Sequence, residues 1–145
     1  MRDTLLGLGR VLKITADTTV LVRALVRDDP DQASQAMEVL EQAELVAMPV
    51  PMLCELVWVL RRVYGLDRGD CVEAITALLA SRSVVVNRPA VEAGLRLLAA
   101  GGDFADGVIA FEGRALGAQA LISFHREAAR LLEQVNEPVV LLAQQ

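Results

Sequence analysis

Residues 13–27 read KITADTTVLVRALVR, and this stretch decides the fold class. Its first four residues, Lys13-Ile14-Thr15-Ala16, are short and partly β-branched, which predicts a strand. From Thr18 onward apolar residues recur at helical spacing, which predicts a helix over 18–27. Asp17 stands between the strand and the helix. The rest of the chain repeats this order of strand and helix.

Short apolar runs predict further strands at 45–48, 84–86, 120–124 and 138–142, and helical patterns lie between them at 30–43, 51–63, 68–80, 89–100 and 103–116, with a short last helix ending near 132. Wholly apolar strands that alternate with helices indicate a parallel sheet covered on both faces. We therefore expect an α/β fold, a three-layer α/β/α domain with a central parallel sheet. Since no linker or repeat divides the chain, residues 1–12 are expected to be an N-terminal extension and residues 13–142 a single domain.

Composition and charge limit the classes of function. The chain has 145 residues, 54% of them hydrophobic, with 19 acidic and 14 basic residues and a net charge of −5. This charge argues against binding nucleic acid through a broad positive field, although bound cations can invert the electrostatics of an acidic site. Cys54 and Cys71 fit no zinc or redox spacing, and no stretch is apolar enough to span a membrane. A reduced, cytoplasmic setting is the expectation.

Two acidic residues in the first half of the chain are candidates for a functional site. Asp17 follows the first strand, at the sheet edge where parallel α/β proteins bind their ligands; its alternative role is to cap the next helix. Glu55 lies within LCELVWVL at 53–60, where an unpaired ionised carboxylate would be costly. Glu55 therefore needs either a metal ion or an arginine, such as Arg61 or Arg62, beside it.

Three further candidates lie in the second half of the chain. Residues 101–110 read GGDFADGVIA, and the spacing places Asp103 and Asp106 on one face of a starting helix. Acids at a helix start are also ordinary caps that interact with the helix dipole, so Asp106, inside the apolar part of the helix, is the better candidate. His125, the single histidine, follows the strand at 120–124, at the predicted edge where Asp17 lies; its alternative is a solvated loop side chain.

These acids together favour a site for a hard cation. Carboxylates are the oxygen ligands that Mg²⁺ and Mn²⁺ take. Such a cation activates water and neutralises charge on a phosphate that is being cleaved. The sequence also lacks a phosphate-binding GxxxxGK[ST] loop and a serine-hydrolase elbow. The acids therefore favour the hypothesis of a metal site that acts on a phosphate.

Four segments, in order along the chain, resemble the PIN-domain ribonucleases of the VapC toxin type. They are ITADTTVLVR at 14–23, PMLCELVWVL at 51–60, DFADGVIA at 103–110 and LISFH at 121–125. They resemble, in turn, the family's opening strand with its DTN signature, the helix that carries its glutamate, its D-x-x-D-x-x-I-A helix and its closing T/S-F-D strand end. The resemblance covers roughly Leu12 to Gln134.

The resemblance implies an acidic pocket that binds Mg²⁺ or Mn²⁺ and cleaves RNA with a metal-activated water. Asp17 and Asp106 would be the principal metal ligands, and Glu55 would complete the catalytic set. Asp103 would add charge or hold water at the rim, and Ser123 would hold a metal-bound water or the scissile phosphate. The resemblance also implies a homodimer that a small antitoxin neutralises, with DNA bound only through the antitoxin.

Two positions depart from the family pattern. Thr19 stands where the family usually has Asn, and a hydroxyl cannot reproduce the paired groups of a carboxamide. His125 stands where the family usually has a fourth Asp; a neutral imidazole can ligate Mn²⁺ but suits Mg²⁺ poorly. Two other hypotheses therefore stay open: a catalytically weak PIN-fold protein that acts by binding RNA or a partner, and an unrelated metal-dependent phosphohydrolase.

Overall fold

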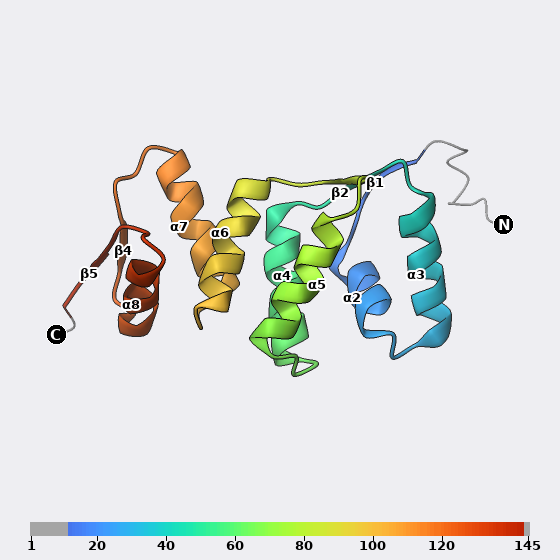
Figure 1. Ribbon diagram of the computed structural model, residues 1–145, viewed down its shortest axis with the longest axis horizontal. Coiled ribbons are helices and arrows are strands. Elements are labelled where there is room, and N and C mark those ends of the chain that lie inside the picture. The colour runs from blue at the N-terminus through green and yellow to red at the C-terminus, as the bar shows by residue number, and fades with distance from the viewer. Residues whose placement is uncertain (1–11, 144–145) are drawn as a thin grey trace. The chain divides into compact units, whose positions relative to one another are not determined.

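A computed structural model describes residues 12–143, and its helices and strands alternate along the chain (Figure 1). The elements are β1 (Lys13–Thr15), α2 (Thr18–Val26), α3 (Pro30–Gln42), β2 (Leu45–Ala47), α4 (Val50–Arg62), α5 (Arg68–Leu79), β3 (Val84–Val85), α6 (Arg88–Ala99), α7 (Phe104–Ala115), β4 (Leu121–Ser123), α8 (Arg126–Gln134) and β5 (Val139–Leu141). Each predicted strand and helix is present, with ends that shift by one or two residues. Within the described residues, no helix is both long and apolar enough to cross a membrane.

The chain divides into two compact units, and of the described residues the first contains 12–66 together with Glu73–Val86. Its strands form a parallel sheet in the order β1-β2-β3, with Ile14 opposite Val46 and Val46 opposite Val84. Helix α2 packs against both α3 and α4 (Figure 1). Fully buried leucines line these helices, among them Leu21 on α2 and Leu53 on α4.

The second unit contains Asp67–Val72 and the chain from Asn87 onward. Strands β4 and β5 form a parallel pair, α6 packs along α7, and α8 packs on β5 (Figure 1). The core of this unit consists of Leu97, Ala110, Leu131 and Leu132, with Leu121, Val135 and Val139 packed against it. Leu121 and Val139 lie directly opposite each other on β4 and β5, so one face of this sheet covers the core.

The α/β class with parallel strands is therefore confirmed. The strands fall into a three-stranded and a two-stranded sheet, one in each unit. The extension predicted at 1–12 lies, apart from Leu12, outside the described residues. Leu12 itself is buried, and its carbonyl accepts hydrogen bonds from the backbone N–H groups of Glu44 and Leu45. The single domain over 13–142 stays a prediction.

Helix α7 lies unusually close to α6 because residue 107 is glycine. A Cβ atom at Gly107 would lie 2.6 Å from the carbonyl oxygen of Ala93 and 3.0 Å from the Cα of Gly94. Phe104, in the first turn of α7, is fully buried. This close packing fixes the first turn of α7, which carries two of the acidic residues of interest.

The other end of α7 is held by an ion pair. Arg114 donates from Nε to one carboxylate oxygen of Glu137 at 2.6 Å and from Nη2 to the other at 3.2 Å. The Glu137 side chain is buried, and this paired geometry gives its charge a partner. Both ends of α7 are thus anchored within the second unit.

Candidate metal-binding carboxylates

Asp17 occupies the N-cap position of α2 without capping it. Its backbone is extended (φ −89°, ψ 156°), as an N-cap requires, but its side chain makes no capping hydrogen bond with a backbone N–H of the first turn. The side chain is exposed, and its Oδ2 accepts a hydrogen bond of 2.9 Å from the hydroxyl of Thr19. The capping alternative therefore holds for the backbone of Asp17 but not for its carboxylate.

Glu55 lies on the exposed face of α4, which corrects the expectation that it sits in apolar surroundings. The opposite side of this helix is buried, and the buried residues are Val50, Met52, Leu53, Leu56, Val57 and Leu60. Position 55 lies on the side of the helix that faces away from these buried residues. Water therefore solvates the Glu55 carboxylate, and no buried charge has to be neutralised. The buried apolar residues near Glu55 in the sequence led to a wrong prediction of its environment, because they lie on another face of the helix.

Thr18 is a site residue that the sequence analysis did not identify. Its hydroxyl donates a hydrogen bond of 2.7 Å to Oε1 of Glu55, although 37 positions separate the two residues. The Thr18 side chain is 5% exposed at the first position of α2, so its hydroxyl has a fixed environment. Of the two arginines expected near Glu55, Arg61 instead donates to the carbonyl of Leu66 at 3.3 Å.

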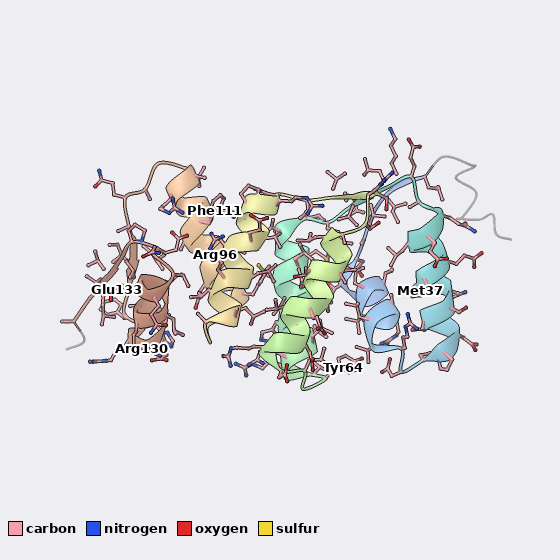
Figure 2. All side chains as sticks on the ribbon, in the orientation of Figure 1. Met37, Tyr64, Arg96, Phe111, Arg130 and Glu133 are labelled. Carbon is pink, nitrogen blue, oxygen red and sulfur yellow. The ribbon has the colours of Figure 1, made fainter. Side chains whose placement is uncertain are left out.

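A second contact holds α2 on α4. Arg23, in the last turn of α2, donates from Nη1 to the hydroxyl of Tyr64 at 3.3 Å. Tyr64 lies just beyond the end of α4 (Figure 2). Together with the Thr18–Glu55 bond, this contact holds α2 on α4 at both ends of α2. Asp17 and Glu55 are therefore presented by two helices whose mutual position is fixed within the first unit.

Asp103 and Asp106 lie at the start of α7 in the second unit. Asp103 is the N-cap residue, with an extended backbone (φ −102°, ψ 129°), and its side chain makes no capping bond. Asp106 lies in the first turn and is half-buried. Burial, and then the nearby negative charge of Asp103, raise the pKa of Asp106, while His125 lowers it. A cation beside Asp106 would favour its ionised form and so oppose the effects of burial and of Asp103 on its pKa.

Other helices of the same chain use their N-cap side chains in the ordinary way. Asp29 accepts from the backbone N–H of Gln32 at 3.1 Å, and Asn87 accepts from that of Ala90 at 3.4 Å. Side-chain caps of this kind thus form at both of these helix starts. Against this background, the carboxylates of Asp17 and Asp103 stand out as acceptors that their helices leave unused.

His125 caps α8 through its ring. Nδ1 accepts a hydrogen bond of 3.1 Å from the backbone N–H of Ala128, and the hydroxyl oxygen of Ser123 accepts one of 2.9 Å from the backbone N–H of His125. An accepting Nδ1 places the ring proton of a neutral imidazole on Nε2. Nε2–H and the Ser123 hydroxyl proton are therefore donors, suited to an oxygen of water or phosphate.

The predicted site residues thus form two sets. Asp17 and Glu55 are linked through Thr18 and Thr19 in the first unit, and the second unit contains Asp103, Asp106, Ser123 and His125. Over residues 12–143, no group of three or more His, Cys, Asp or Glu side chains is close enough to hold a metal ion. The candidate metal ligands are the carboxylate oxygens of Asp17, Glu55, Asp103 and Asp106, which are exposed or half-buried. Carboxylate oxygens fit Mg²⁺ or Mn²⁺.

The parallel strands define an α/β protein, a class that binds its ligands beyond the carboxyl ends of the strands, where Asp17 and His125 lie. The sequence profile of the PIN domain matches residues 14–135, which is most of the chain, and the protein belongs to the PIN domain family. PIN domains are generally nucleases, and those nucleases generally use divalent metals. No curated protein sequence matches the chain.

Proposed function

We propose that this protein is a metal-dependent endoribonuclease and the toxin of a toxin–antitoxin pair. Membership of the PIN family supports the nuclease activity. The observation that carries the proposal is the state of the helix starts: Asp17 and Asp103 occupy N-cap positions, yet their carboxylates cap nothing. Because neither carboxylate caps its own helix, its oxygens can serve as ligands of a cation.

Asp17 and Asp106 are the proposed ligands of Mg²⁺ or Mn²⁺. Glu55, oriented by Thr18, completes the catalytic set, and Asp103 raises the negative charge around Asp106. A divalent cation, when bound, lowers the pKa of water and neutralises charge on the cleaved phosphate. Ser123 and Nε2–H of His125 donate hydrogen bonds, to water or to the scissile phosphate.

Cleavage of a mixed RNA pool tests this proposal. Purified protein is incubated without metal, with Mg²⁺ or with Mn²⁺, beside an Asp106→Asn variant purified identically. We expect cleavage that depends on the metal and is lost in the variant. Equal cleavage by both proteins would show that the assigned site is wrong or that a contaminating nuclease acts. No cleavage by either folded protein would contradict the proposed activity.

The proposed role as a toxin has its own tests. Induced expression should arrest growth, Asp17→Asn should relieve the arrest, and a small open reading frame immediately upstream should encode a DNA-binding antitoxin that also relieves it. Light scattering of the purified protein should give the mass of a homodimer. Growth arrest by Asp17→Asn at full strength would contradict a toxic activity that depends on the site.

A second candidate is a PIN-fold protein with weak catalysis that acts by binding RNA or a partner. The observation that favours it is the role of His125, whose Nδ1 is occupied as the cap of α8 at a position where the family usually has an acid. The same RNA experiment separates the two candidates, since a binding protein retains RNA without cleaving it under any metal condition.

A further inference from the structure

Trp58 is an exposed aromatic residue one helical turn from Glu55. Residues 55, 58 and 62 follow one another on α4 at spacings of three and four, so Glu55, Trp58 and Arg62 form a single stripe of that helix. All three are exposed, and Trp58 keeps 56% of its surface in contact with solvent. The chain's one tryptophan therefore stands between an acidic and a basic side chain on a solvent-facing surface.

The exposure of Trp58 does not come from a loose helix. Its neighbours Leu56 and Val57 are 0% and 2% exposed, and Leu60 is also fully buried. The Thr18–Glu55 and Arg23–Tyr64 bonds hold the same helix against α2. The indole is thus an aromatic side chain that a well-anchored helix presents to solvent beside Glu55 and Arg62.

We infer that Trp58 stacks on an unpaired base of the RNA substrate, with Arg62 contacting the adjoining phosphate. The inference rests on the proposed nuclease function and names the form of its substrate: a single-stranded segment whose bases are free to stack. A base offers a π-face of the size of an indole, and such stacking accepts any of the four bases. The stripe has what this requires, since an aromatic surface lies between the proposed catalytic carboxylate and a cation.

Binding of a short single-stranded RNA in EDTA tests the inference without requiring cleavage. Fluorescence anisotropy of end-labelled RNA is measured with the wild type, Trp58→Ala, Trp58→Phe and Val63→Ala. Loss of one stacked base corresponds to a weakening of affinity of about tenfold or more. We expect this loss in Trp58→Ala and recovery of most of the affinity in Trp58→Phe, which keeps a ring. Val63, at the end of α4 and 61% exposed, is the matched control, and Val63→Ala should bind like the wild type.

Because the chain has one tryptophan, its own emission reports on the contact. RNA should quench the emission of Trp58, whereas an abasic oligomer of equal length and charge should not. Equal quenching by the abasic oligomer, or unchanged affinity in a folded Trp58→Ala variant, would overturn the inference. A change of emission with protein concentration alone would assign the surface to a second copy of the chain and would also overturn it.

The outcomes separate this inference from the proposed function. RNA binding that quenches Trp58, without cleavage under any metal condition, would contradict the nuclease and support the stacking contact. Metal-dependent cleavage by Trp58→Ala with an unchanged KM would support the nuclease and contradict the contact. If both hold, Trp58→Ala raises KM while kcat at saturating RNA stays near that of the wild type.

Discussion

The hydroxyl of Thr18 donates to the carboxylate of Glu55 across a gap of 37 positions, at a distance of 2.7 Å. This bond joins the first residue of α2 to the middle of α4 and gives Glu55 a defined orientation although its side chain is exposed. The neighbouring Thr19 does the same for Asp17 at 2.9 Å. Two consecutive threonines thus orient two carboxylates, and Thr19 performs this role at the position where an amide was expected.

Replacing Thr18 by valine keeps the shape of the side chain and removes the donor. We expect the free energy of unfolding to fall by about 1 kcal/mol, because the hydrogen bond from the buried hydroxyl to Glu55 is lost. Cleavage should fall by about 10- to 100-fold, the usual effect of losing a group that orients a residue of a metal site. Thr18→Ser, which keeps the donor, is the control. Wild-type cleavage by a folded Thr18→Val protein would show that the bond does not position Glu55.

Asp106→Asn should stabilise the protein at neutral pH even as it removes activity. The pKa of Asp106 is raised in the folded state by burial and by Asp103, so ionising this group at neutral pH costs folding free energy. The neutral amide avoids that cost. The gain should shrink as the pH falls through the folded pKa and vanish below the unfolded value of about 3.9.

Denaturant unfolding of both proteins across this pH range measures the difference. Adding Mg²⁺ or Mn²⁺ at neutral pH should raise the melting temperature of the wild type and leave that of Asp106→Asn almost unchanged. An Asn variant that is less stable than the wild type at pH 7 would contradict the unfavourable charge assigned to Asp106.

Substituting Gly107 by alanine tests how α7 is held. The new methyl group would press against the carbonyl of Ala93, so α7 must move away from α6. We expect a loss of about 1–3 kcal/mol in unfolding free energy, typical of an overpacked contact, and reduced cleavage because Asp106 is the adjacent residue.

The same helix offers a matched control at Gly113. A Cβ atom there would meet nothing within 4 Å, so Gly113→Ala should be neutral or stabilising by up to about 1 kcal/mol through helix propensity alone. Chemical denaturation of both variants measures their changes in unfolding free energy. Similar losses in the two proteins would mean that the contact with Ala93 is not what makes residue 107 sensitive.

His125 can be varied so that capping and metal binding are separated. His125→Ala removes the Nδ1 acceptor for the Ala128 N–H and should cost about 1 kcal/mol, as the loss of an N-cap does. His125→Asp retains a good cap and adds a carboxylate near Asp106, so it should keep the stability and strengthen Mg²⁺ binding, measured by calorimetry. Weaker Mg²⁺ binding by a folded His125→Asp protein would argue against His125 lying next to the cation.

Most of the fold could be predicted from the sequence because its signals are local. Pro30 after the N-cap Asp29 begins α3, and Gly101 (φ 110°) lies just beyond the end of α6. The alternation of these helices with apolar runs predicted the α/β class. The arrangement of the strands in two sheets could not be predicted in this way, because pairing depends on contacts between distant residues.

The candidate acids were also found from sequence, but their surroundings were not. Glu55 was placed in apolar surroundings because its neighbours in sequence are apolar, whereas the packing of α4 buries the opposite side of the helix and leaves Glu55 exposed. Thr18 was missed because its partner is distant in sequence. The ring nitrogen that His125 uses as a cap depends on the backbone of Ala128, and the identity of a single residue does not reveal it.

Helices α2 and α7 begin without the side-chain caps that α3, α6 and α8 have. The backbone N–H groups of these first turns therefore receive no acceptor from the side chains of their N-cap residues. Oxygen atoms of a nucleic acid phosphate are natural acceptors for such amides. Because Thr18 and Phe104 are buried, both turns are already held in place by packing, and an anionic ligand would meet these amides without any folding step.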